Sequence, residues 1–168
     1  MDSFQKLLCE KAKYKRELMG KNFFPRVPVL LIDLSKQKES KILKDLVEAV
    51  DALNLATVVI SEDGEGLKSS KNIHVMKPEE KKQAFYLADF AVIPENEIKT
   101  AWGFGCAPIA QMDGKLTVNY SPLQEKGNGF YFANPTKWEI FAGIVRAVET
   151  YQFPYDWENL VREMIKVN

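Results

Sequence analysis

The sequence predicts an α/β protein with a doubly wound, mostly parallel, Rossmann-like sheet of about six strands. Short runs that are apolar at every position alternate with longer segments whose apolar residues recur every third or fourth position. Runs that are apolar throughout are typical of parallel strands that helices cover on both faces. The length of 168 residues is ordinary for one domain, so we expect a single domain over residues 1–168.

The first element expected is a helix over residues 3–18, SFQKLLCEKAKYKREL, and Gly20 is a natural stop for it. Apolar residues such as Phe4 and Leu8 fall on one face. The opposite face is expected to be basic, and its residues are Lys6, Lys11, Lys13, Lys15 and Arg16. This helix either packs on its own sheet or mediates a homodimer.

Two buried strands with a helix between them come next. Prolines precede the first strand, Val29–Asp33, and the second is the apolar run Ala56–Ser61. Ser40 can cap the intervening helix, which we expect to continue to about Asn54. The apolar residues of this helix lie on one stripe, as an amphipathic helix against a sheet requires.

The rest of the chain repeats this alternation. Further strands are expected at Asn72–Met76, Phe90–Pro94, Ala107–Met112 and, after a turn, within Gly127–Phe132. Further helices are expected after Pro78, over Ile98–Phe104, from Pro135 to about Tyr151, and over Asp156–Val167 with Asp156 as a cap.

Composition excludes several classes of function. Lys plus Arg and Asp plus Glu balance at 23 each, so no net charge attracts nucleic acid or an acidic membrane. The two cysteines, Cys9 and Cys106, suit reduced thiols, and His74 is the single histidine. No apolar run approaches the roughly 20 residues of a membrane helix, and no signal peptide is evident. We therefore expect a cytoplasmic protein.

A series of short motifs runs along nearly the whole chain, among them LIDLSKQKES (Leu31–Ser40), LADFAVIP (Leu87–Pro94), GNGFYFANPT (Gly127–Thr136) and WENLVREMI (Trp157–Ile165). In wording and order they resemble S-R-L-x-x-Q-K-G, A-D-F-x-x-x-P-S, G-T-G-F-x-F-x-x-x-T and W-x-x-L-x-x-x-x-M of the glycogen and bacterial starch synthases. The resemblance implies the C-terminal, donor-binding domain of a retaining glycosyltransferase of GT-B architecture. Such enzymes use a nucleotide-diphosphate-glucose donor, here ADP-glucose or UDP-glucose.

The loop after the first strand departs from the family pattern at charged positions. In the family a basic pair from this loop neutralises the diphosphate, the task of positive clamps in group transfer. This chain keeps Lys38 of that pair but has Asp33 at the arginine position and Glu39 at the glycine position. An acid beside a diphosphate repels it, so we expect a local field of reversed sign.

The loop after Phe90–Pro94 departs further. The family has E-P-C-G-L-T-Q, whose glutamate contacts the donor, and this chain has the shorter ENEIKTAWGFG (Glu95–Gly105). Glu95 or Glu97 can stand in for that glutamate, and the glycine and threonine turn has no counterpart. We also expect no counterpart, upstream of Met1, of the domain that holds the acceptor in the family.

The candidate residual donor site consists of Ser35, Lys38, Glu95, Glu97, Gly127 and Gly129, with no catalytic residue and no metal ligand assigned. Most of these residues also have a purely structural explanation. Lys38 can be a solvated loop lysine, Glu95 and Glu97 can be acids at a helix start, and Gly127–Gly129 can form a turn with positive φ. Asp33, Asp63 and Glu65 form either a solvated acidic rim or a cation site. The tryptophans and tyrosines either stack on glucose rings or belong to the core.

Three functions follow from these observations. The leading one is a degenerate stand-alone relative of the donor-binding domain, inactive in transfer by itself, with at most weak nucleotide-sugar or glucan binding and no obligatory cofactor. The second is the donor-binding subunit of a split glucosyltransferase, whose partner is a separate acceptor-binding domain. The third is a structural or regulatory protein that acts as a homodimer.

Overall fold

The computed structural model describes residues 3–20, 27–35, 40–62, 67 and 70–167. Six strands form one sheet in the order β3-β2-β1-β4-β5-β6, and every pair of neighbours is parallel. The strands are β1 (Val29–Asp33), β2 (Ala56–Ile60), β3 (Ile73–Met76), β4 (Phe90–Val92), β5 (Ala107–Gln111) and β6 (Phe130–Phe132). The predicted α/β class, with its doubly wound parallel sheet, is confirmed.

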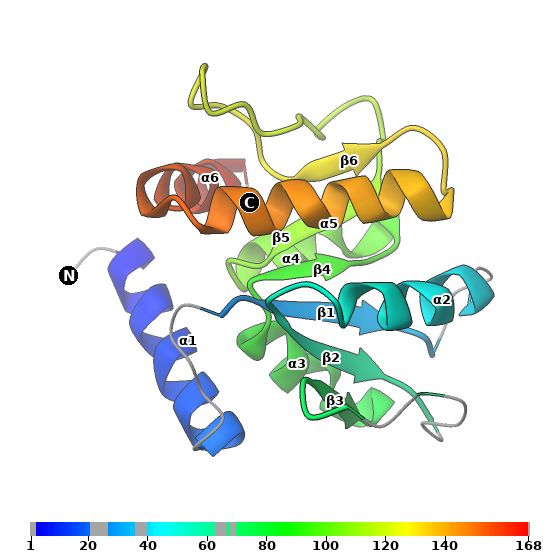
Figure 1. The fold of residues 1–168 in the computed structure, drawn as a ribbon. Coiled ribbons are helices and arrows are strands. Elements are labelled where there is room, and N and C mark those ends of the chain that lie inside the picture. Colours follow the sequence, from blue (N-terminus) through cyan, green and yellow to red (C-terminus); the bar gives the residue numbers. More distant parts are fainter. Residues whose placement is uncertain (1–2, 21–26, 36–39, 63–66, 68–69, 168) are drawn as a thin grey trace.

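Helices lie on both faces of this sheet. They are α1 (Ser3–Met19), α2 (Ser40–Val50), α3 (Lys81–Leu87), α4 (Ile98–Gly103), α5 (Lys137–Tyr151) and α6 (Pro154–Val167), with 3-10 turns η2 (Pro78–Glu80) and η3 (Glu95–Glu97). In Figure 1, α2 and α5 lie over the near face, α3 and α4 over the far face, and α1 stands beside the amino ends of the strands. The carboxyl ends of the strands point the other way.

Helix boundaries differ from the sequence prediction where local hydrogen bonds decide them. The helix expected to reach Asn54 ends at Val50, because a turn in which the Leu53 N–H donates to the Val50 carbonyl (2.9 Å) leads into β2. Helix α5 begins after Thr136, whose hydroxyl caps it by accepting from the Glu139 N–H at 3.3 Å. Helix α6 begins at Pro154, so Asp156 lies in its first turn.

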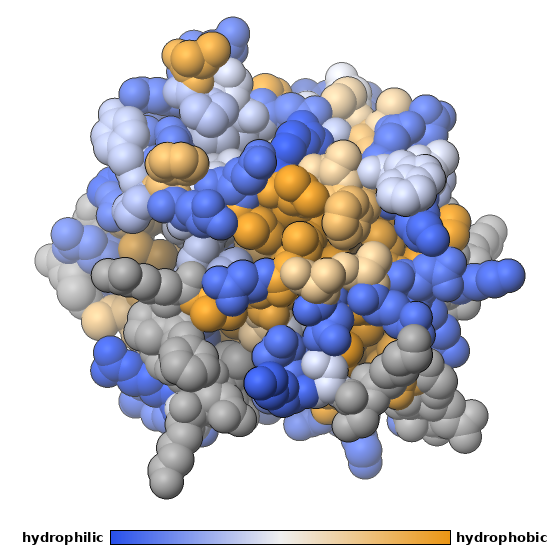
Figure 2. Space-filling model, viewed as in Figure 1, coloured by the Kyte–Doolittle hydropathy of each residue, from blue (hydrophilic) through white to orange (hydrophobic). Residues whose placement is uncertain are grey.

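The core confirms the apolar runs read as strands. Every residue of β1, β2 and β4 is buried, as strands covered on both faces require. Figure 2 shows further apolar side chains gathered over α5 and the adjoining face of the molecule. Cys106 is fully buried, and burial raises the pKa of its thiol to about 12, so it is the packed, unreactive thiol that was expected.

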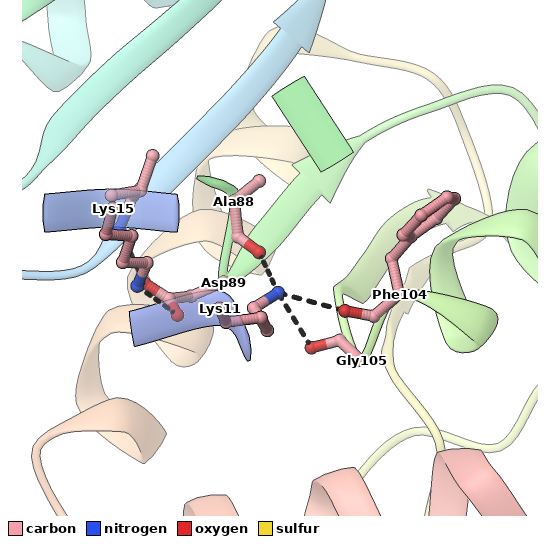
Figure 3. A network of polar contacts seen from close by, with 7 residues as sticks. Lys11, Lys15, Ala88, Asp89, Phe104 and Gly105 are labelled. Carbon is pink, nitrogen blue, oxygen red and sulfur yellow. Dashed lines mark hydrogen bonds and ion pairs between the residues drawn. The ribbon is translucent and has the colours of Figure 1, made fainter. Parts of the chain in front are cut away.

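The basic face predicted for α1 is wrong for two lysines. Lys11 and Lys15 are buried, with 4% and 6% of their surface exposed. Lys15 pairs with Asp89 at 2.5 Å, and Lys11 donates to the carbonyls of Ala88, Phe104 (3.1 Å) and Gly105 (3.3 Å), as Figure 3 shows. The lysines share a helix face with Phe4 and Leu8 because 4, 8, 11 and 15 follow the helical period. Helix α1 thus packs within its own domain, chiefly against α3 and α6.

Among the described helices, none combines the length and the apolar character that crossing a bilayer requires.

Candidate functional site

The sheet changes direction of winding between β1 and β4, which are neighbours in the sheet but far apart in the chain. Ligands of open α/β sheets bind at the carboxyl ends of the strands, at this switch point. Strand β1 ends at Asp33 and is followed by Ser35, and β4 leads through Pro94 into η3 with Glu95 and Glu97. The switch point is therefore the place to look for the expected donor site.

An ion-paired cluster bridges this switch point. The Lys81 ammonium, at the start of α3, lies 2.5 Å from Asp33 Oδ2 and 2.5 Å from Glu97 Oε1. We call Asp33, Lys81 and Glu97 the carboxyl-end triad. It ties β1, α3 and η3 together at the switch point, and it holds one cation against two carboxylates.

Asp33 is the most enclosed member of the triad, with 1% of its surface exposed. Its Oδ1 accepts from the N–H (2.8 Å) and the hydroxyl (2.6 Å) of Ser35. Burial by itself raises the pKa of this carboxyl, but the hydrogen bonds from Lys81 and Ser35 outweigh it, so the pKa is lowered. The solvated acidic rim predicted for Asp33 is wrong, because the carboxylate is buried and neutralised by Lys81.

Lys81 and Glu97 are more accessible, with side chains 22% and 20% exposed. Burial lowers the pKa of Lys81, but its hydrogen bonds to Asp33 and Glu97 outweigh this effect, so the pKa is raised and the ammonium stays charged. Glu97 Oε2 is buried and accepts no hydrogen bond from the described residues. The triad thus leaves one carboxylate oxygen unsatisfied at the switch point.

A cavity of about 650 Å³ adjoins η3 and is lined by Glu95, Lys99, Trp102, Asp113 and Leu116, among others. Glu95 and Lys99 are exposed at this cavity, whereas Trp102 is buried in its wall. Asp113 shapes the loop after β5, because its Oδ1 accepts from three successive backbone N–H groups and one hydroxyl. These hydrogen bonds, led by that from the Lys115 N–H, lower the pKa of Asp113 to about 2.

The Gly127–Gly129 turn lies behind Trp102, whose indole N–H donates to the Asn128 carbonyl at 2.8 Å. Gly127 has φ +121°, and a Cβ there would lie 2.4 Å from the Tyr120 Cα. A Cβ on Gly129 would lie 2.6 Å from the Tyr131 hydroxyl. Both glycines have a packing reason, which is the structural alternative that the sequence left open.

The structure brings some of the predicted site residues together and not others. Ser35 and Glu97 meet through Asp33 and Lys81, and Glu95 lines the neighbouring cavity. Lys38 lies outside the described residues, as do Glu39, Asp63 and Glu65. Among the residues that are described, no group of His, Cys, Asp or Glu could hold a metal ion.

Lys81 is the residue that sequence reasoning missed. Its position at the first turn of the helix that follows β3 was a usable signal, because helices that follow parallel strands begin at the carboxyl edge of the sheet. The sequence did not show that this edge brings it to Asp33 and Glu97.

Comparisons with known proteins bear on the fold and on part of the sequence. No family model matches the chain. Over 71 residues the chain is 34% identical to Glycogen synthase 1 of Synechocystis sp., a stretch that is 40% of this chain and 15% of that protein. Over this stretch the chain is similar in sequence to a glycogen synthase. Its fold matches the catalytic domain of starch synthase IV from Arabidopsis thaliana, bound to ADP and acarbose, with a TM-score of 0.77 and 18% identity.

The match to starch synthase IV covers 98% of this chain and 40% of the plant chain. The chain thus spans less than half the length of that plant chain, and its likeness to it is one of fold. The predicted resemblance to the glycogen and starch synthases is confirmed, in sequence over 71 residues and in fold over 98% of the chain.

Proposed function

We propose that this chain is a degenerate glycogen synthase-like domain that does not transfer glucose by itself and binds nucleotide-sugars or glucans weakly at most. The observation that carries the proposal is the carboxyl-end triad. At the switch point, Lys81 is already held by two carboxylates at 2.5 Å each. A donor diphosphate would have to compete with them for the ammonium.

Charge supports weak donor binding. The triad carries a formal charge of one cation and two carboxylates, so a diphosphate that enters meets net repulsion. Two unit charges 4 Å apart interact by about 4 kcal/mol at an effective dielectric constant of 20. Even a fraction of this cost weakens binding strongly, because each 1.4 kcal/mol is about a factor of ten in affinity.

Catalysis by the isolated chain is further disfavoured by positioning. Holding donor and acceptor together supplies about 7–11 kcal/mol of a transfer barrier. The chain corresponds to 40% of the starch synthase IV chain, so a surface that holds the acceptor would come from another polypeptide or another part of one. We therefore expect no transfer from ADP-glucose or UDP-glucose to a glucan with this chain alone.

Calorimetric titration with ADP, UDP and their glucose conjugates tests the proposal. We expect dissociation constants of about 1 mM or weaker, which corresponds to about 4 kcal/mol of binding free energy. Binding at micromolar strength would contradict a degenerate donor site. A transferase assay with glycogen in the same buffer should give no release of nucleoside diphosphate.

A second candidate function is the donor-binding subunit of a split glucosyltransferase. Exposed apolar side chains favour it: Met112, Leu116 and Val118, near the carboxyl end of β5, are 45%, 45% and 53% exposed. Such side chains suit coverage by a partner domain. This candidate predicts nucleoside diphosphate release when the chain is mixed with its acceptor-binding partner and a glucan. The homodimer alternative predicts a doubled mass in light scattering.

A further inference from the structure

A second cavity lies at the opposite, amino end of the sheet, between α1 and α6. Figure 1 shows α1 beside the amino ends of the strands, with α6 close to its first turns. The cavity has a volume of about 620 Å³, within the range of about 300–1,000 Å³ typical of small-molecule pockets. We call it the amino-end pocket; the lining residues that matter are Lys15, Asp89, Tyr151, Gln152, Trp157 and Glu158.

The floor of the amino-end pocket is a fixed ion pair. Lys15 Nζ lies 2.6 Å and 2.5 Å from the two carboxylate oxygens of Asp89, and Asp89 Oδ2 also accepts from the Val29 N–H at 2.9 Å. Both side chains are more than nine-tenths buried, at 8% and 6% exposed. The floor therefore presents polar atoms whose positions are set before any ligand arrives.

One wall of the pocket is aromatic. The Tyr151 and Trp157 rings meet edge to face with centroids 4.9 Å apart, and Trp157 also packs against Phe90 at 6.3 Å. These contacts hold the rings in place on the side of α5 and α6. An aromatic wall beside a few fixed polar groups suits a ligand with an apolar face and hydrogen-bonding edges.

The charges exclude an anion as the preferred ligand. The cations among the described lining residues are Lys15, which Asp89 neutralises, and Lys11, which donates to three backbone carbonyls. Neither ammonium is left to pair with a phosphate or carboxylate. Glu158 and Gln152 are exposed at the pocket and offer a carboxylate and an amide to hydroxyl groups.

We propose that the amino-end pocket binds a neutral carbohydrate ring, with an apolar sugar face against Tyr151 and hydroxyl groups hydrogen-bonded to Gln152, Glu158 and the Lys15–Asp89 pair. The preference for a neutral polyhydroxylated ring follows from the lining residues. The choice of an α-linked glucan rests on the proposed function. The site would hold a glucan at the end of the sheet away from the carboxyl-end triad, so the two sites are separate.

Titration of the full chain with maltotriose, followed by two-dimensional NMR, tests this proposal. We expect saturable shifts at the Trp157 indole and along α1, with millimolar affinity. The double variant Gln152→Ala/Glu158→Gln removes hydrogen-bonding groups at exposed positions and should weaken binding by about fivefold or more. Glu163→Gln, a matched change on α6 outside the pocket, should leave the affinity unchanged.

A variant of the aromatic wall sharpens the test. Tyr151→Leu should lower maltotriose affinity by about tenfold, the scale of one lost aromatic contact. If Tyr151→Leu does not fold, the Gln152→Ala/Glu158→Gln variant still tests whether maltotriose binds in the amino-end pocket. No saturable binding up to about 50 mM, or equal affinity of the wild type and the double variant, would overturn the proposal.

The ADP and maltotriose titrations together distinguish a failure of the proposed function from a failure of the proposed pocket. Tight ADP binding with no maltotriose binding would defeat both the degenerate donor site and this pocket. Weak ADP binding with no maltotriose binding would defeat the pocket alone. Maltotriose shifts that the pocket variants weaken, seen alongside weak ADP binding, would support both.

Discussion

Lysine–carboxylate pairs stand at both ends of the sheet, and their surroundings differ. At the amino end, Lys15 and Asp89 are more than nine-tenths buried at the floor of the amino-end pocket, and both Asp89 oxygens accept hydrogen bonds from within the domain. At the carboxyl end, Lys81 is about one-fifth exposed and is shared by Asp33 and Glu97, of which Glu97 keeps one oxygen unsatisfied. The same chemistry thus forms a fully paired pocket floor at one end and an incompletely satisfied link between β1, α3 and η3 at the other.

The largest effect that tests this contrast is expected from Asp89→Ala. The change leaves the buried Lys15 ammonium and the Val29 N–H without an acceptor. Removing one partner of a buried pair costs about 3–5 kcal/mol of unfolding free energy. Urea denaturation measures it, and Glu17→Ala, which breaks an exposed 3.9 Å pair with Lys13, should cost less than about 1 kcal/mol. Equal losses in the two variants would refute a structural role for the amino end.

Lys81→Met should be less costly. It leaves Asp33 buried without a cation, but Ser35 still donates two hydrogen bonds to that carboxylate. We expect a loss of about 2–3 kcal/mol, the scale of a hydrogen bond to a charged group. Lys82→Met, a neighbouring change at an exposed position, is the control and should stay within about 0.5 kcal/mol. If Lys81→Met left the free energy of unfolding unchanged, the triad would not contribute to stability.

Alkaline pH should act on the two ends in opposite directions. The pKa of Lys81 is raised above 10.5, so its contribution is present below that value and is lost as pH rises through the folded pKa. The pKa of Lys11 is lowered, mainly by burial, so the cost of its charge is relieved as pH rises towards 10.5. Urea titrations between about pH 8 and 11 should therefore show Lys81→Met gaining, and Lys11→Met losing, relative to the wild type. Parallel trends would contradict the assignment.

Acid should weaken the carboxyl end. The pKa of Asp33 is lowered from 3.8, so its contribution is present above that value and is lost as pH falls through the folded pKa. Asp33→Asn should therefore flatten the fall in stability below about pH 4, measured by urea denaturation at several pH values. An unchanged slope would show that other carboxyl groups cause the fall.

The smallest effect expected is on ligand affinity. Glu97→Gln removes one negative charge from the triad and loosens the hold on Lys81. ADP should then bind about fivefold more tightly, as a gain of about 1 kcal/mol implies. Calorimetry measures this change, and Glu149→Gln, at an exposed position on α5, serves as the control. A weaker ADP interaction in Glu97→Gln would argue that Glu97 itself contacts the nucleotide.

The strands could be predicted from the sequence because their signal is local. Val29–Asp33 and Ala56–Ile60 are apolar except for Asp33 and Thr57, and every residue of both strands is buried. The triad could not be predicted in the same way, because Lys81 is 48 residues from Asp33 in the chain and meets it only through the sheet order. The buried lysines of α1 were missed because charged residues are rarely buried, although their helical spacing with Phe4 indicated the face.

Lys11 has a consequence for how the chain can be divided. Its ammonium donates hydrogen bonds to carbonyl groups at the ends of two helices, because Ala88 is the C-cap of α3 and Phe104 is the C-cap of α4. One cation from the first helix thus closes two later helices that are otherwise far from it in sequence. A shortened polypeptide that began at β1 would leave the Ala88 and Phe104 carbonyl groups and the Asp89 carboxylate without their lysine partners. It would therefore be less stable than the domain that includes α1.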